Sequence, residues 1–369
     1  AGPLASTPAL RYPGAMGRQR DLAEDLRERA ARALRIGHHD EALAALAAAV
    51  QADPDSSLAH HDLGGVLKLL GRLAEAEASL RRAHELAPDD PRTRHALGIV
   101  LMSQGRYREG WPLYDARHAI PQLGLVKPAL PFPEWRGEDV AGKRLLIFPE
   151  QGLGDQIQYA RFAPSLAARG ADVTLICHPV LAQLFDRCLG VRVLAASGGV
   201  EFPDPDYWVM SGSVVGRTGV DPDDLPKTPY LPADLGPVRP SGRIGVVTRG
   251  NPAHTNDAHR SLPAAQAAEL MALPGAVSLH PEDTGAKDMA DTAAIVAGLD
   301  LVVTVDTAVA HLAGAMGKPV WILLPRVMTD WRWMEGRTDS PWYPSARLWR
   351  QPAPGDWQSV LRDVRAALG

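Results

Sequence analysis

A period of 34 residues constrains the first third of the chain more than any other feature of the sequence. Pro54 and Pro88 stand 34 residues apart, and a glycine precedes each of them at the same distance, Gly37 and Gly71. Further pairs at this spacing are Ala42 with Ala76, Leu46 with Leu80, and Ala49 with Ala83. Small residues let two antiparallel helices approach closely, and proline ends the second helix of each copy. The period therefore predicts stacked helix pairs.

The helical period continues into a third, incomplete copy. Leu63-Gly64 recurs as Leu97-Gly98, but Gly110 stands where the pattern has alanine, and no closing proline follows at the expected place. A period of this length and composition is the tetratricopeptide (TPR) pattern. We predict all-α repeats at residues 19–120. Because about three copies are needed for a stable array, we expect the last helices to pack against the segment that follows.

Charge and cysteine content exclude several classes of protein. The formal charge is −4, so no basic field attracts nucleic acid or anionic lipid. No apolar run reaches the roughly 18 residues of a membrane span. Cys177 and Cys188 form no metal-type pair and no disulfide framework, which predicts a reducing compartment and a cytoplasmic location. Residues 1–18 lack the features of a signal peptide, and we expect a flexible tail there.

After a proline-rich loop at residues 118–140, short apolar runs alternate with helical stretches, as in Arg144–Phe148, then the helical Gln156–Arg169, then Val173–Cys177. Alternation of this kind predicts parallel α/β units. The proline-rich stretch Asp221–Pro240 divides the series into two Rossmann-like lobes, residues 121–238 and residues 239–369. We expect ligands in the cleft between the lobes, at the carboxyl ends of the strands. The last helix, Trp357–Leu368, is expected to pack back on the first lobe.

A glycine-rich turn follows the first predicted strand, in the run Glu150-Gln151-Gly152-Leu153-Gly154-Asp155. The two glycines allow a close backbone approach, and the helix that follows offers free N–H groups to an anion. Asp155 is open to two interpretations. A carboxylate here can accept a proton from an acceptor hydroxyl, but aspartate also commonly caps helices, and spacing alone favours the cap.

A second candidate lies where the apolar strand Leu301–Val305 gives way to Asp306-Thr307 and a helix of small residues. The N–H groups and the dipole of that helix suit a phosphate. His311, about one turn into the helix, can give a hydrogen bond or a positive charge to a leaving phosphate. The alternative is a purely structural histidine, but the strand–turn–helix context favours the functional interpretation.

A polar loop follows the first strand of the second lobe and contains Gly250, Asn251, Asn256 and Arg260. Arg260 can pair with a phosphate through two hydrogen bonds. The alternative is a solvated loop. Because His254 and the other histidine of the loop lack a third ligand at a recognisable spacing, we expect no metal.

Tryptophans gather near the end of the chain. Trp331 and Trp333 flank an arginine, and Trp342 follows. Their rings can stack on a base or a sugar beside the cleft, or they can cover the edge of the sheet.

Taken together, these motifs resemble bacterial TPR proteins with a two-lobed (GT-B) glycosyltransferase domain. The domain is similar to lipopolysaccharide heptosyltransferases and, more distantly, to protein O-GlcNAc transferases. The resemblance is carried by Gly110-Trp111 through Arg117, the Glu150–Asp155 turn, the Gly250–Ser261 loop, the Asp306–Ala313 stretch, and Trp331-Arg332-Trp333 with Ser340–Pro344.

The resemblance implies a metal-independent, inverting transfer from a nucleotide-activated sugar. It implies Asp155 as the base, with Asp306, Thr307 and His311 at the donor. It also implies a protein acceptor held in the TPR groove, since some relatives of this layout glycosylate flagellin. Thr248-Arg249 replace the tryptophan that usually opens the family loop, which leaves the identity of the donor open. A TPR adaptor without turnover is the competing hypothesis. A lipopolysaccharide sugar transferase ranks lower, because it gives no reason for a TPR array.

Overall fold

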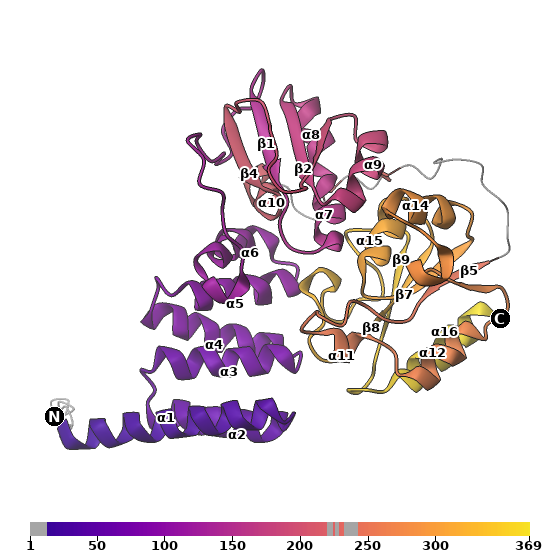
Figure 1. The fold of residues 1–369 in the computed structure, drawn as a ribbon. Helices are drawn as coiled ribbons and strands as arrows, with labels where there is room; N and C mark the ends of the chain where they lie inside the picture. Colours follow the sequence, from indigo (N-terminus) through magenta and orange to yellow (C-terminus); the bar gives the residue numbers. More distant parts are fainter. Residues whose placement is uncertain (1–12, 220–223, 226–228, 232–242) are drawn as a thin grey trace, which may run out of the picture. The chain divides into compact units, whose positions relative to one another are not determined.

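The computed structural model describes residues 13–219, 224–225, 229–231 and 243–369 (Figure 1). The chain divides into two compact units, one ending at Val100 and the other running from Leu101 to Gly369. Helices of the first unit are α1 (Pro13–Arg35), α2 (His39–Ala52), α3 (Ser57–Leu69), α4 (Leu73–Leu86) and the greater part of α5 (Pro91–Ser103). Most of the predicted tail lies outside the described residues, but α1 begins at Pro13, so residues 13–18 are helical.

The helix pairs of the first unit confirm the predicted TPR repeats. In Figure 1 helices α1 to α4 lie in a stack, with each pair antiparallel. Gly37, Gly71 and Gly105 turn the chain within successive pairs with φ angles of 76°, 73° and 81°. Residues with a side chain rarely adopt this backbone conformation, which explains why a glycine recurs every 34 residues. Close packing explains Gly64, where an added Cβ would lie 2.5 Å from Leu80 Cγ.

The boundary between the compact units lies after Val100, some distance before the predicted end of the repeats at residue 120. Helix α6 (Tyr107–Tyr114) completes the third pair but packs within the second unit, against α10 (Ser211–Thr218). Trp111 explains this packing, because its Cβ would lie 2.8 Å from a Cβ added to Gly216 of α10. The short 3-10 helices η1 (Asp115–Ala119) and η2 (Pro121–Leu123) follow α6.

The second unit contains two parallel sheets, as the alternating pattern predicts. The first sheet has the order β3-β2-β1-β4. Its strands are β1 (Arg144–Phe148), β2 (Asp172–Cys177), β3 (Arg192–Ala195) and β4 (Tyr207–Met210). Strand β1 is central, with Leu145 paired to Val173 on one side and to Tyr207 on the other.

Helices α7 (Leu153–Ala160), α8 (Phe162–Ala168) and α9 (Pro179–Cys188) connect the strands of the first sheet. The sequence predicts one helix over Gln156–Arg169, but the structure breaks it at Arg161. Pro164 explains the break, because it has no N–H to donate to the carbonyl of Ala160, four residues earlier.

The second sheet has the order β6-β5-β7-β8-β9. Its strands are β5 (Ile244–Val247), β6 (Ala276–Ser278), β7 (Leu301–Val305), β8 (Val320–Leu324) and β9 (Ala346–Arg350). Its helices are α11 (Asp257–Arg260), α12 (Ala264–Met271), α13 (Pro281–Thr284), α14 (Met289–Ala297), α15 (Ala308–Ala315), the 3-10 helix η4 (Trp331–Trp333) and α16 (Trp357–Leu368). The chain reverses its direction across the sheet between β5 and β7, where parallel sheets commonly bind ligands.

The last helix corrects one prediction. Instead of returning to the first lobe, α16 packs on the second sheet, where Trp357, Val360, Leu361 and Val364 join one buried cluster with residues of β5, β7 and β8. The apolar side of this amphipathic helix meets α12 as well. The helix follows β9 after a short loop, so the nearest apolar surface is that of its own sheet.

Candidate active site

The first functional side chain lies at the start of α7. Gly152 is the N-cap residue of the helix, and its backbone N–H donates to Asp155 Oδ2 at 2.8 Å. This contact is half of a capping box. Capping of the helix therefore occupies one of the two carboxylate oxygens of Asp155. The carboxylate stays 20% exposed, which leaves it accessible to a substrate hydroxyl.

The second oxygen of Asp155 accepts a hydrogen bond from Arg332. Arg332 is 4% exposed, and it also donates to Gln158 Oε1 and, at 2.9 Å, to the hydroxyl of Tyr159. Asp330 accepts from the same guanidinium at 3.0 Å with each of its oxygens. Arg332 therefore joins the first helix of one sheet to the segment that follows β8 in the other.

Sequence reasoning did not assign a role to Arg332, because the run Asp330–Trp333 drew attention to its aromatic rings. A signal was present. Asp330 caps η4 by accepting from the backbone N–H of Arg332 at 2.9 Å. The spacing Asp-x-Arg within an aromatic run is therefore consistent with an arginine whose guanidinium is held by the aspartate of the same turn.

Burial raises the pKa of Asp155 above its ordinary value. The Arg332 guanidinium and the Gly152 N–H act in the opposite direction, and the nearby Asp330 carboxylate reinforces the rise. A carboxylate with a raised pKa is a better proton acceptor than a solvated one, which suits a general base.

The second strand–helix junction contains Asp306 and Thr307. Thr307 is the N-cap residue of α15, and its hydroxyl lies 3.2 Å from that of Thr304. Burial raises the pKa of the Asp306 carboxyl, and the carboxylate of Asp330 adds to the effect, while Trp333 and Arg260 oppose it. The predicted donor residues Asp306 and Arg260 are neighbours, since Arg260 Nη1 donates to the backbone carbonyl of Asp306 at 2.8 Å.

His311 lies inside the junction between α7 and α15. Its Nδ1 is 2.9 Å from the hydroxyl of Tyr343, and its ring packs on Trp333 with 5.2 Å between the ring centroids. A Cβ added to Gly154 would lie 2.7 Å from the imidazole Cδ2. The glycine of the predicted turn therefore makes room for the histidine ring.

Of the two roles that the sequence suggested for His311, its surroundings in this structure favour the hydrogen bond over the positive charge. Burial lowers the pKa of the imidazole to about 3, and the cations Arg332 and Arg161 lower it further. The ring is therefore neutral at physiological pH, and a hydrogen bond is the remaining role.

The loop after β5 contains the other predicted donor residues. A Cβ on Gly250 would lie 2.5 Å from Arg260 Nη2, so the glycine lets the guanidinium cross the backbone. Asn251 is exposed, and its side chain accepts from the N–H of Ala253. Asn256 is 7% exposed and donates to the carbonyl of Met328 at 2.9 Å, tying two loops together.

The two tryptophans proposed to stack on a ligand are buried. Trp331 is 4% exposed and Trp333 0% exposed. Trp331 packs among four aromatic rings, those of Tyr107, Trp111, Tyr114 and Trp342. In this structure neither tryptophan has a free face for a base or a sugar, and Trp333 packs on His311 and Tyr343.

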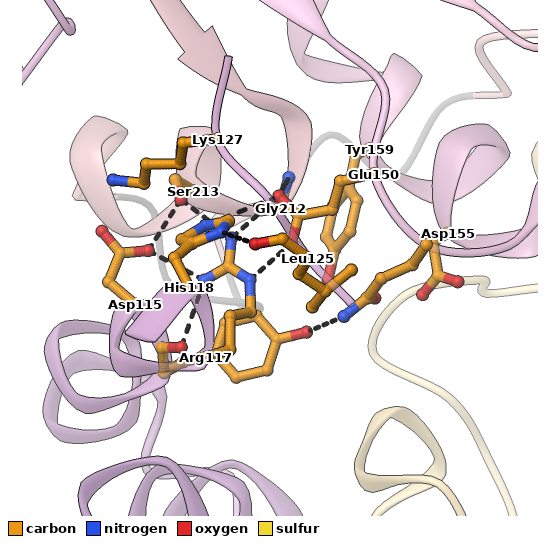
Figure 2. Close-up of polar contacts among 12 residues, drawn as sticks. Asp115, Arg117, His118, Leu125, Lys127, Glu150, Asp155, Tyr159, Gly212 and Ser213 are labelled. Carbon is orange, nitrogen blue, oxygen red and sulfur yellow. Dashed lines mark hydrogen bonds and ion pairs between the residues drawn. The ribbon is translucent and has the colours of Figure 1, made fainter. Parts of the chain in front are cut away.

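Gln151 directly precedes the α7 cap and has a φ angle of 62°, a left-handed conformation that is uncommon for a residue with a side chain. Its side chain donates to the hydroxyl of Tyr114 at 2.9 Å. Figure 2 shows the buried contacts around Glu150, the residue before it, with Asp155 nearby. Among the residues that the structure describes, no three His, Cys, Asp or Glu side chains form a group that could hold a metal ion.

Comparison with known proteins gives a match in the helical part of the chain and another in the second sheet region. A tetratricopeptide repeat model matches residues 33–97, and the model of glycosyltransferase family 9 (heptosyltransferase) matches residues 263–324. The second match includes Asp306, Thr307 and His311 and does not extend to Asp155. The chain thus contains TPR repeats and a glycosyltransferase family 9 segment. Across the described ranges, no helix is both long and apolar enough to span a bilayer.

Among curated proteins, the chain is similar to Protein FlbA of Caulobacter vibrioides (strain CB 15). The two are 27% identical over 312 residues, which cover 70% of this chain and 52% of the relative. The chain therefore spans about half the length of the curated relative that it matches.

Several solved TPR-containing structures are similar to about a quarter of this chain. The second TPR of Spaghetti (RPAP3), bound to an HSP90 peptide, is 16% identical, with a TM-score of 0.27 over 28% of this chain and 94% of that one. The Arabidopsis OM64 TPR domain is 16% identical, with a TM-score of 0.27 over 28% and 87%. MamA is 24% identical, with a TM-score of 0.25 over 27% and 58%. Because these TM-scores are low, the repeat assignment rests on the period and the helix pairs themselves.

Proposed function

We propose that this protein is an inverting, metal-independent glycosyltransferase that moves a sugar from a nucleotide-activated donor to a serine or threonine hydroxyl of a protein acceptor. The observation that carries the proposal is the packing of Gly154 on His311. It brings the start of α7, with Asp155, against α15, which begins directly after Asp306-Thr307.

In the proposed reaction the phosphate of the donor lies at the N-terminus of α15. Backbone N–H groups and the helix dipole there favour an anion. Arg260 is the cation beside Asp306, and it offsets the charge that develops on the leaving nucleotide. Neutral His311 contributes a hydrogen bond and the shape of the site.

Asp155 takes the proton of the acceptor hydroxyl as the hydroxyl oxygen attacks the anomeric carbon. The bond from that carbon to the phosphate oxygen breaks, and its electron pair leaves with the nucleotide, so the configuration inverts. Arg332 stays beside Asp155 throughout and keeps the carboxylate oriented. In this scheme the proton moves to Asp155 and the negative charge moves to the leaving group.

The test of the base is Asp155→Asn. We expect sugar transfer to fall by about 10²-fold or more, while calorimetry gives unchanged donor affinity, because the donor contacts lie on the other sheet. Asp363→Asn, on the exposed side of α16, is the matched control and should keep wild-type transfer. Unchanged turnover in Asp155→Asn rejects Asp155 as the base.

The donor residues are tested separately. Arg260→Ala should weaken nucleotide binding, and wild-type affinity in this variant refutes the donor assignment. A thermal-shift panel of UDP-, ADP-, GDP- and CMP-sugars identifies the nucleotide. A ligand that binds only the folded chain raises the free energy of unfolding by about 2.7 kcal/mol at a hundredfold excess over its Kd.

The acceptor follows from the repeats. TPR helix pairs commonly bind peptides, and we infer that the array presents a protein acceptor, with flagellin as the first candidate. Incubation of the full chain with donor and purified flagellin should add one sugar mass per modified residue. Transfer to a lipid but not to protein contradicts this part of the proposal.

A non-catalytic adaptor is the second candidate. One observation favours it, since both oxygens of Asp155 are already hydrogen-bonded in this structure. Release of free nucleotide in the presence of acceptor separates the two candidates, because an adaptor releases none.

A further inference from the structure

A closed ionic network lies behind the turn that carries Asp155 (Figure 2). Arg117, from η1, and Glu150, two residues after β1, both have fully buried side chains. Arg117 donates from Nε to one carboxylate oxygen of Glu150 at 2.5 Å and from Nη2 to the other at 2.9 Å. Ser213 and Asp115 accept from the same guanidinium at 2.8 and 2.9 Å.

The start of α10 packs tightly against the Arg117–Glu150 ion pair. The backbone N–H of Gly212 donates to Glu150 Oε2 at 3.2 Å. A Cβ added to Gly212 would lie 3.1 Å from Arg117 Nη2 and 3.1 Å from Glu150 Cδ. Glu150 is therefore fixed by two elements, η1 and the start of α10.

Arg117 is also linked to Gln151, the residue after Glu150, through Tyr114. Its guanidinium lies 4.3 Å from the centre of the Tyr114 ring, and it donates to the Tyr114 carbonyl at 3.2 Å. The Tyr114 hydroxyl in turn accepts from the side chain of Gln151. Glu150, which precedes Gln151, and Tyr114, which binds its side chain, thus both contact Arg117.

The next residue is Gly152, whose N–H binds Asp155. We propose that the Arg117–Glu150 ion pair is a positioning device for the reaction, which fixes the Gln151–Gly152 turn and through it the carboxylate of Asp155. The inference rests on the proposed function for its catalytic consequence. Neither member of the pair touches the reacting atoms.

The test replaces the pair by apolar side chains of similar length, Arg117→Met with Glu150→Met. Removing one partner leaves a buried charge unpaired, whereas replacing both is often neutral for stability, so the double variant is expected to fold. We expect kcat to fall by about tenfold to a hundredfold because the base is misplaced, with the KM for the donor unchanged. A wild-type kcat in the folded double variant overturns the proposal.

Arg217 and Glu134 provide a matched control. They form another ion pair of low exposure, which is linked to Arg117 through Asp115, and neither residue is hydrogen-bonded to residues 150–152 in the part of the chain that the structure describes. Arg217→Met with Glu134→Met should keep the wild-type kcat. If both double variants lose kcat equally, the role of Arg117 is merely structural, and the proposal is wrong.

Hydrogen exchange gives a readout that does not need activity. In the Arg117→Met, Glu150→Met variant the amide of Gly152 should exchange faster, because its hydrogen bond to Asp155 is released. A wild-type exchange rate at Gly152 overturns the positioning role even if the chain transfers no sugar. Faster exchange in a chain without transferase activity instead refutes the proposed function and leaves the positioning of the turn intact.

Discussion

Gly154→Ala tests the contact on which the proposed site depends. The added methyl group would lie 2.7 Å from His311 Cδ2 and 3.2 Å from Nε2, whereas ordinary van der Waals contact begins at 3.4 Å. The imidazole cannot simply turn aside. Trp333 and Tyr343 pack against it, and the Tyr343 hydroxyl holds Nδ1 at 2.9 Å. Helices α7 and α15 therefore have to separate by several tenths of an ångström.

Overpacking of this kind costs about 1–3 kcal/mol. Gly154 lies in the first turn of α7, where alanine is intrinsically favoured over glycine by about 0.5–1 kcal/mol at most. The clash is larger than the propensity gain, so we expect the free energy of unfolding to fall by about 1–2 kcal/mol. Sugar transfer should fall as well, because the base moves away from the donor helix.

Urea denaturation followed by tryptophan fluorescence measures the stability change, and a coupled nucleotide-release assay measures turnover. Gly199→Ala is the control, since nothing lies within 4 Å of its added Cβ. Adding His311→Ala to Gly154→Ala should relieve the clash, so that the double variant is more stable than the sum of the single changes predicts. A wild-type unfolding midpoint and turnover in Gly154→Ala would refute the packing of α7 on His311.

Three further changes give direct measurements. Gly64→Ala should destabilise the repeats by about 1–3 kcal/mol, because its Cβ would lie 2.5 Å from Leu80 Cγ, whereas Gly65→Ala, with nothing within 4 Å, should be neutral or stabilising in thermal unfolding. Folding lowers the pKa of His311 from 6.5 to about 3, so the unfolded chain binds a proton at a higher pH than the folded chain does. The free energy of unfolding should therefore drop by about 1.4 kcal/mol per pH unit as the pH falls from 6.5 towards 3. His311→Gln should show a shallower drop in urea titrations. Because the pKa of Asp306 is raised, ionising this carboxyl lowers the stability of the folded chain at pH values above its ordinary pKa of 3.8. Asp306→Asn should therefore raise the Tm at pH 8 and have no such effect near pH 4.

The repeats and most strands could be predicted because their signals are local. A glycine with positive φ recurs once in each helix pair, and apolar runs such as Leu301–Val305 coincide with buried strands. Strands β4 and β9 are missing from the prediction. The four residues of β4, Tyr207–Met210, are too short to stand out from the loop before them, and β9, Ala346–Arg350, contains two arginines in place of an apolar run. The break at Arg161 depends on one residue, Pro164, within an otherwise helical pattern.

The candidate site could be predicted only in part, because most of its contacts join residues far apart in the sequence. The positions of Asp155 and His311 follow from strand–turn–helix patterns. The contact of Arg332 with Asp155 spans 177 residues, and no local pattern indicates it. Neutral His311 and buried Trp331 likewise depend on packing that a sequence pattern does not contain.

The aromatic cluster around Trp331 sets a limit on how this architecture can change. Tyr107, Trp111 and Tyr114 of α6 share a core with Trp331 and Trp342, which come from far along the chain. Recombination between repeats can lengthen or shorten the array ahead of α5, where each copy has the same neighbours. A second copy of α6 would lack these partners for its aromatic rings, so we expect the repeat array to gain or lose helix pairs only ahead of α5.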